Sequence, residues 1–71
     1  MCVRFGKAIL ERRLELGWSQ EKLSYKADLN RTYIGDIERG VRNVSLRNIE
    51  KISKALRLSM TELSKRMEKE R

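Results

Sequence analysis

Apolar residues recur along the chain at intervals of three and four, the spacing of a helix with one face turned inward. The first stripe of this kind contains Phe5, Ala8 and Ile9, and polar or charged residues fill most positions around it. Similar stripes predict five helices, over about 3–16, 20–27, 31–39, 46–56 and 60–68. We therefore expect an all-α fold in a single domain spanning residues 1–71.

Residues suited to begin or end a helix stand between these stripes. The expected N-caps, whose side chains accept hydrogen bonds from the first turn, are Ser19, Asn30 and Ser45. The expected helix ends are Gly17, Asp28 and Gly40, because these residue types tolerate a left-handed backbone better than most. Trp18 lies between the first two helices, where we expect it to plug the core.

The chain carries a strong positive charge. Among its 71 residues, 17 Lys and Arg face 10 Asp and Glu, which gives a net charge of +7. On a domain of this size, that balance favours a polyanionic partner such as nucleic acid. A protein-interaction module with an incidental basic face remains the alternative from a different class.

Composition argues against several other classes. The chain has no histidine, and Cys2 is its one cysteine, so a cysteine–histidine zinc site and an intramolecular disulfide are excluded. It also lacks a glycine-rich phosphate loop, and we expect no enzyme, no metal, no cofactor and no small-molecule substrate. With no signal peptide and no apolar run of 18 residues, we expect no membrane association. A lone cysteine fits a reducing cytosol, which favours a cytoplasmic protein.

Segment 20–38 has the organisation of a helix-turn-helix, two short helices joined by a short turn and followed by a glycine. In such a unit the first helix braces against the phosphate backbone, and the second presents its N-terminal residues to base edges in the major groove. The second helix therefore needs one apolar and one polar side. Ile34 and Ile37 supply the apolar side. The polar side is expected to hold Arg31, Thr32, Tyr33, Gly35 and Asp36.

The run GWSQEKLSYKADLNRTYIGDIERG resembles the Cro/phage-repressor type of helix-turn-helix, also called the xenobiotic-response-element family. With SLxxIxKIxKAL in the fourth predicted helix, the resemblance extends from Phe5 to Leu63. It implies a compact five-helix, lambda-repressor-like DNA-binding domain. More narrowly, LNRTYIGDIERGVRN resembles the controller proteins of restriction-modification systems. Arg12 departs from the family, which is usually apolar at this place, so Leu10 or Leu16 must compensate.

Arg31, Thr32 and Tyr33 are expected to form the base-reading edge. The helix dipole disfavours a positive charge at a helix start, so DNA binding explains Arg31 better than stability does. An arginine can donate two hydrogen bonds to one guanine, which discriminates by about 1–3 kcal/mol. Tyr33 could instead contact the sugar-phosphate backbone or cover the core.

Four residues are expected to bind the DNA backbone: Gln20, Arg42, Asn43 and Asn48. For Gln20 the resemblance implies either a phosphate contact or a brace on the third helix. For Arg42 and Asn43, in the following loop, it implies contacts with phosphates or with the adjacent groove. Asn48 lies near the start of the fourth helix, where its amide and the helix N-terminus could hold a phosphate.

Two charged pairings are expected near this surface. The resemblance implies that Arg13 and Glu38 form a largely buried ion pair between the first and third helices. Asp36 is unusual on a surface that would face phosphates. It could accept a hydrogen bond from N4 of a cytosine. We favour instead that it orients Arg31 or Arg39 through an ion pair, because an unpaired carboxylate would be repelled there.

The last predicted helix carries Met60, Leu63 and Met67 in one stripe. We expect this stripe to complete the core and, along its exposed edge, to form an isologous dimer interface. A dimer would place two recognition helices on two half-sites and so multiply the discrimination.

These features favour a sequence-specific transcriptional regulator that binds a palindromic operator in double-stranded DNA as a homodimer. The resemblance further implies the controller protein of a restriction-modification system. A phage immunity repressor and an antitoxin-like regulator are the alternatives. Activation would require a contact with RNA polymerase, for which the acidic Glu21 is one candidate.

Overall fold

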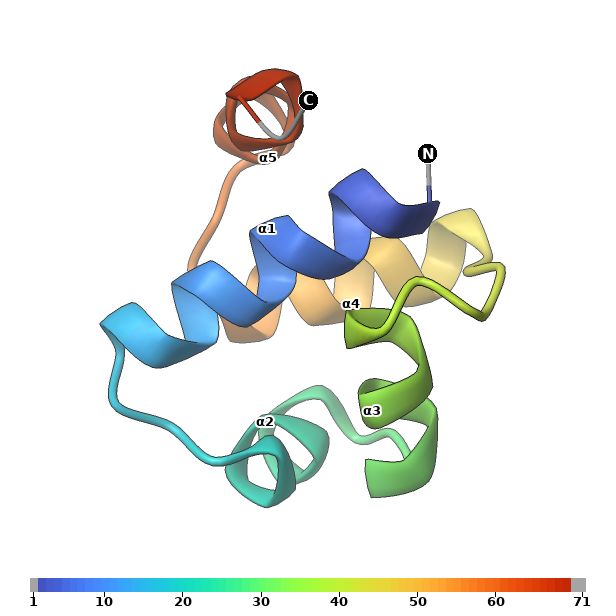
Figure 1. Ribbon diagram of the computed structural model, residues 1–71. Coiled ribbons are helices and arrows are strands. Elements are labelled where there is room, and N and C mark those ends of the chain that lie inside the picture. Colours follow the sequence, from blue (N-terminus) through green and yellow to red (C-terminus); the bar gives the residue numbers. More distant parts are fainter. Residues whose placement is uncertain (1, 70–71) are drawn as a thin grey trace.

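The computed structural model describes residues 2–69, which form five helices and contain no strand (Figure 1). They are α1 (Cys2–Glu15), α2 (Gln20–Ala27), α3 (Arg31–Glu38), α4 (Leu46–Ala55) and α5 (Met60–Lys69). The predicted all-α fold is confirmed, and each predicted boundary lies within one residue of the observed one. Residues 1, 70 and 71 of the predicted domain lie outside the described residues.

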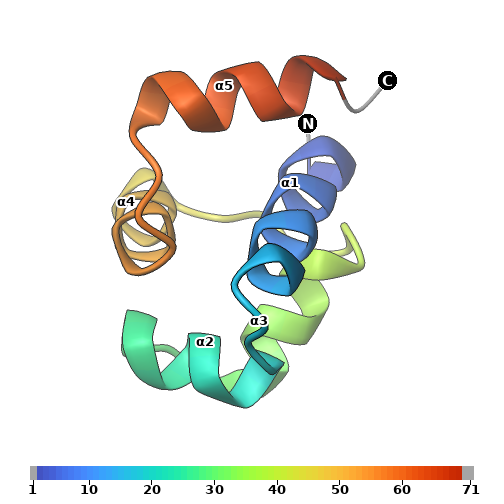
Figure 2. The same ribbon diagram turned by 90° about the vertical axis from the view of Figure 1, so that its left-hand side faces the viewer.

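The helices enclose one core. Figures 1 and 2 show α5 across one end of the molecule and the α2–α3 pair at the other, with α1 and α4 between them. Every helix contributes to the core, in which α1 packs on α3 and α5, and α4 packs on α2 and α5. The buried apolar residues are Phe5, Ala8, Ile9, Leu23, Ala27, Ile34, Ile37, Ile52, Leu56, Leu58 and Leu63. Trp18 packs against this cluster, as expected of a plug.

The three predicted N-caps are confirmed. The Ser19 hydroxyl accepts from the amide of Lys22 at 3.0 Å, and the Asn30 side chain accepts from the amide of Thr32 at 2.7 Å. The Ser45 hydroxyl accepts from the amide of the residue three positions on, at 3.2 Å. These bonds satisfy amides that would otherwise have no partner in the first turn.

The first four helices all end in the same reverse turn, with one residue in the left-handed region. Gly17 and Gly40 occupy this place after α1 and α3, with φ of 71° and 74°. Asp28 and Arg57 occupy it after α2 and α4, with φ of 56° and 58°. The sequence predicted three of these ends. It did not indicate the strained backbone of Arg57, because arginine has no preference for that region.

Helix α1 approaches α3 most closely at Gly6. A Cβ atom added there would lie 2.2 Å from the carbonyl oxygen of Ile37 and 3.0 Å from that of Glu38. Only a glycine allows the two backbones to come this near. This contact fixes the C-terminal end of α3 against α1.

Charged side chains hold α5 and α4 to α1. Arg66 donates to Glu15 through two nitrogens, each at 2.8 Å, and to Glu11 at 3.0 Å. The hydrogen bonds from Arg66, followed by those from Arg12, hold the pKa of the Glu15 carboxyl at about 2. Arg12 also donates to the carbonyl of Leu56 at the end of α4, at 3.0 Å. Arg12, at a position that is usually apolar in the family it resembles, thus caps the C-terminal end of α4.

Of the two residues expected to compensate for Arg12, Leu16 packs against the core.

Within residues 2–69 the structure has no helix that is both long and apolar enough to cross a membrane.

Candidate nucleic-acid interface

The α2–turn–α3 unit occupies the end of the molecule opposite α5 (Figure 2). Ile34 and Ile37 of α3 are buried against α1 and α2, as predicted. Arg31 and Thr32 are exposed at the N-terminus of α3, and neither side chain has a partner among the described residues. These two side chains are therefore free to meet a ligand without first breaking a contact.

The expected exposure of Gly35 was wrong, because this residue is buried. A Cβ atom at Gly35 would lie 3.5 Å from Nη1 of Arg39 and 3.6 Å from Oε1 of Gln20. These two long side chains cover the position: Arg39 from the C-terminal end of α3 itself, and Gln20 from α2. These distances are ordinary van der Waals contacts, so a Cβ atom at Gly35 would not clash with either side chain.

Tyr33 lies at the edge of the exposed surface and is half-buried against the core. Its hydroxyl accepts a hydrogen bond from Nδ2 of Asn48 at 3.0 Å. The guanidinium of Arg42 lies over its ring, 5.0 Å from the centroid. The structure thus brings together three predicted site residues from α3, the following loop and α4.

A shallow open hollow separates the N-termini of α3 and α4. Its lining includes Asn30, Tyr33, Arg42, Asn43, Ser45 and Asn48. The N-cap residues of both helices, Asn30 and Ser45, line this hollow, and a helix N-terminus carries a positive partial charge that favours anions. An anion as large as a phosphate would meet favourable groups there.

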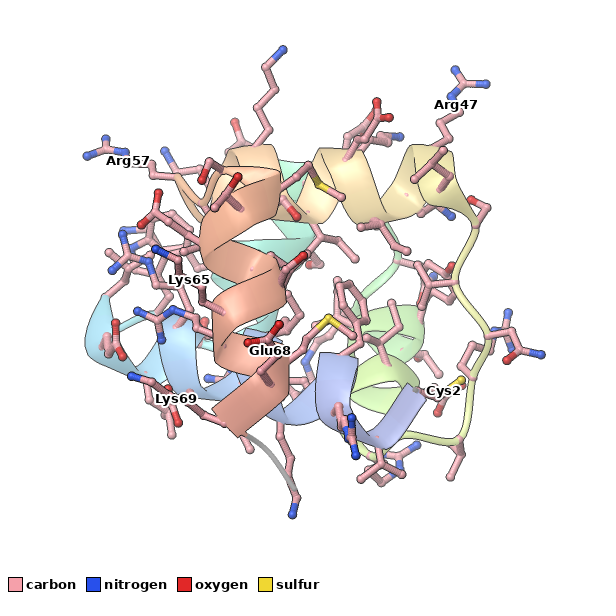
Figure 3. All side chains as sticks on the ribbon, turned by 90° about the horizontal axis from the view of Figure 1, so that it is seen from above. Cys2, Arg47, Arg57, Lys65, Glu68 and Lys69 are labelled. Carbon is pink, nitrogen blue, oxygen red and sulfur yellow. The ribbon has the colours of Figure 1, made fainter. Side chains whose placement is uncertain are left out.

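Asn43 is also linked to α1. The Sγ atom of Cys2 donates to Oδ1 of Asn43 at 3.0 Å, and Figure 3 shows Cys2 beside the loop that precedes α4. The amide group of Asn43 is exposed on that loop. No feature of the sequence indicated this contact, because its partners are 41 positions apart.

Arg13 and Glu38 form the ion pair that the resemblance implied. Nε of Arg13 lies 2.7 Å from Oε2 of Glu38, and Nη2 donates to the other carboxylate oxygen at 3.1 Å. The side chains are 10% and 4% exposed. Nη1 of Arg13 donates to the carbonyl of Trp18 at 2.7 Å, which adds the α1–α2 connection to the network.

Gln20 braces the recognition helix. Its Nε2 atom donates to Oε1 of Glu38 at 2.8 Å, so the side chain is directed toward α3. Of the two roles expected for Gln20, the structure shows this brace. Together with the Arg13 pair, it fixes α3 relative to both α1 and α2.

Asp36 pairs with arginines that follow it in the chain. One carboxylate oxygen accepts from Nη2 of Arg39, and the other lies 3.8 Å from Nη1 of Arg42. The expected pairing with Arg39 is therefore confirmed, while Arg31 is left unpaired. The additional pairing with Arg42 was not foreseen.

The methionine–leucine stripe of α5 divides between two environments. Leu63 is 2% exposed within a single chain. It fills the core between α5 and α1, so its assignment to a dimer interface was wrong. Met60 is 46% exposed, and Met67 packs partly against the core. The surface available to a second copy on this stripe is therefore formed by Met60 and Met67.

Comparisons with known proteins agree with this architecture. The helix-turn-helix family matches this chain over residues 9–63. Control protein C.BamHI of Bacillus amyloliquefaciens is 64% identical over 53 residues, which cover 73% of this chain and 65% of that protein. Control protein C.MunI of Mycoplasma sp is 46% identical over 69 residues, covering 96% of this chain and 93% of that protein.

A solved structure gives the same result in three dimensions. The restriction-modification controller protein C.Esp1396I, a tetramer in complex with its natural 35 base-pair operator, superposes with a TM-score of 0.91. The two chains are 39% identical, and the match covers 97% of this chain and 91% of that one. The chain therefore belongs to the helix-turn-helix family and, within it, to the control proteins of restriction-modification systems.

Proposed function

We propose that this chain is a sequence-specific transcriptional regulator that binds a palindromic DNA operator as a homodimer and controls a restriction-modification operon. The observation that carries the proposal is the free, exposed pair Arg31 and Thr32 at the N-terminus of a rigidly held α3. Helix-turn-helix proteins contact base edges from this end of the second helix. The similarity to control proteins favours this role over a phage immunity repressor or an antitoxin-like regulator.

Within this proposal, Arg31 and Thr32 read bases, because their side chains make no competing contact. Tyr33 stands at the edge of the reading surface, where its hydroxyl is already shared with Asn48. Arg42 and Asn48 grip the DNA backbone at the hollow between the N-termini of α3 and α4. Phosphate contacts of this kind set the register of the protein on the duplex.

Asn43 supplies a further backbone contact through its exposed amide. Gln20 contributes chiefly by holding α3, since its amide nitrogen is bonded to Glu38. The exposed Glu21 on α2 is the group that we propose for a contact with RNA polymerase if the regulator activates transcription. The proposed role requires no catalytic activity. It also implies that the protein acts in the cytoplasm, where the operator DNA is located.

The test of sequence reading is selection of bound duplexes from a random library at physiological salt. The wild-type chain is expected to recover one palindromic motif. The double variant Arg31→Ala/Thr32→Ala should still bind DNA but recover a flattened motif. Arg4→Ala is the control, because Arg4 is an exposed residue of α1 and has no partner among residues 2–69. Failure of the wild-type chain to recover any shared motif would reject specific binding.

The homodimer is proposed to form through the exposed edge of α5, around Met60 and Met67. This edge lies at the opposite end of the molecule from α3, so pairing there leaves the reading surface open (Figure 1). Met60→Glu should abolish pairing without unfolding the chain, because Met60 is outside the core. Sedimentation velocity, with and without a palindromic duplex, measures the outcome. A monomer that occupies full palindromes singly would overturn the dimer.

A further inference from the structure

Helix α3 carries one partly exposed carboxylate, that of Asp36, and it lies between the guanidinium groups of Arg39 and Arg42. Its side chain is 21% exposed, whereas those of Arg39 and Arg42 are 65% and 54% exposed. Each carboxylate oxygen is directed to a different arginine: one accepts from Arg39, and the other lies 3.8 Å from Arg42. Asp36 therefore restrains two arginines at once.

The restraint extends beyond the carboxylate. Arg42 lies across the Tyr33 ring, and the Tyr33 hydroxyl is bonded to Asn48. Arg39 lies over Gly35, where no side chain separates its guanidinium from the α3 backbone. Both guanidinium groups are thus held against the protein. Arg31, at the other end of α3, has no such partner.

A free arginine and a held arginine act differently on DNA. Phosphates are present in every duplex, so a free guanidinium on this surface strengthens binding to any sequence. A held guanidinium must give up part of its ion pair to follow an arbitrary phosphate. It loses less where the DNA presents an acceptor at the position in which the protein already holds it.

We propose that Asp36 is a specificity-determining residue, which suppresses binding to arbitrary duplex DNA by holding Arg39 and Arg42 in the geometry that the operator requires. This inference rests on the proposed function, because it assumes that α3 reads an operator. Asp36 need not touch a base in this role. It acts by limiting how far the guanidinium groups of its two arginine partners can move toward DNA phosphates.

The experiment compares Asp36→Asn with Asp28→Asn. Both variants lose one carboxylate and keep its shape, but Asp28 lies in the α2–α3 turn, and no arginine is paired with it among the described residues. The left-handed backbone of Asp28 also accepts asparagine. Affinities are measured for the motif that the wild-type chain selects and for a scrambled duplex of equal length and composition.

For Asp36→Asn we expect binding to the scrambled duplex to strengthen by about fivefold, the scale of one exposed ion pair. Binding to the motif should change by less than about twofold, since the gain in free charge is offset by lost orientation. The specificity ratio therefore falls. Asp28→Asn should shift both duplexes equally and leave the ratio unchanged.

An equal shift of both duplexes by Asp36→Asn would overturn the inference, because Asp36 would then act only as diffuse negative charge. A second variant, Arg39→Gln/Arg42→Gln, keeps the test valid if Asp36→Asn does not fold. It should weaken motif binding more than scrambled binding, and the reverse order would also overturn the inference. If the wild-type chain selects no motif, the proposed function itself fails, and that result is separate from either ratio.

Discussion

Replacement of Arg13 by methionine tests how strongly the recognition helix depends on its buried ion pair. Arg13→Met removes both hydrogen bonds to Glu38 and the one to the carbonyl of Trp18. The Glu38 carboxylate, 4% exposed, is left with Gln20 as its remaining hydrogen-bond donor. A buried charge that loses its partner typically costs about 3–5 kcal/mol.

That cost is large relative to the stability of such a chain. At about 0.05–0.15 kcal/mol per residue, a domain of this length is stable by about 4–11 kcal/mol in total. Arg13→Met is therefore expected to remove about a quarter of the free energy of unfolding or more. A double variant, Arg13→Met/Glu38→Met, removes the unpaired charge as well and should recover much of the loss.

Urea unfolding at fixed protein concentration, followed by the fluorescence of Trp18 and by circular dichroism, measures the free energy of unfolding. A fixed concentration is needed because any dimer contributes to the apparent stability. The reasoning would be refuted if Arg13→Met cost less than about 1 kcal/mol, the range of an exposed ion pair. It would also be refuted if the double variant were less stable than Arg13→Met alone.

Three further changes probe other parts of the fold. Gly6→Ala should destabilise by at least about 1–3 kcal/mol, because its Cβ would collide with the Ile37 carbonyl, and unchanged urea unfolding would contradict the close α1–α3 approach. Arg57→Gly should stabilise by up to about 1 kcal/mol, since φ of 58° suits glycine, and a lower thermal midpoint would disprove this. Below pH 4.5 the wild-type chain should progressively lose the stability contributed by Glu15, whose pKa is lowered to about 2 by Arg66. The difference in thermal midpoint between wild type and Arg66→Met should therefore be largest above pH 4.5 and vanish near pH 2; a difference independent of pH would count against the pair.

Local signals in the sequence were enough to predict the helices. The N-caps Ser19, Asn30 and Ser45 act on amides two or three residues away, so a short window contains all the information they need. The same holds for Gly17 and Gly40, whose backbone freedom marks a helix end wherever it occurs. Arg57 escaped prediction because arginine has no preference for the left-handed backbone that it adopts here, next to the buried Leu58.

The candidate site was predicted in outline and corrected in its contacts. The exposure of Arg31 and Thr32 follows from their register relative to the buried Ile34 and Ile37, which the hydrophobic period reveals. The burial of Gly35 does not follow from that period, because the covering side chain of Gln20 comes from another helix.

The sequence by itself determined the number, extent and inward faces of the helices, because these depend on interactions within about four residues. Only the tertiary structure decided which side chains meet across helices. It placed Leu63 in the core rather than at an interface, joined Cys2 to Asn43, and gave Asp36 a second arginine in Arg42. The physical reason is that these contacts depend on helix crossing angles and loop paths, and a hydrophobic period shows which face turns inward but not what it meets there.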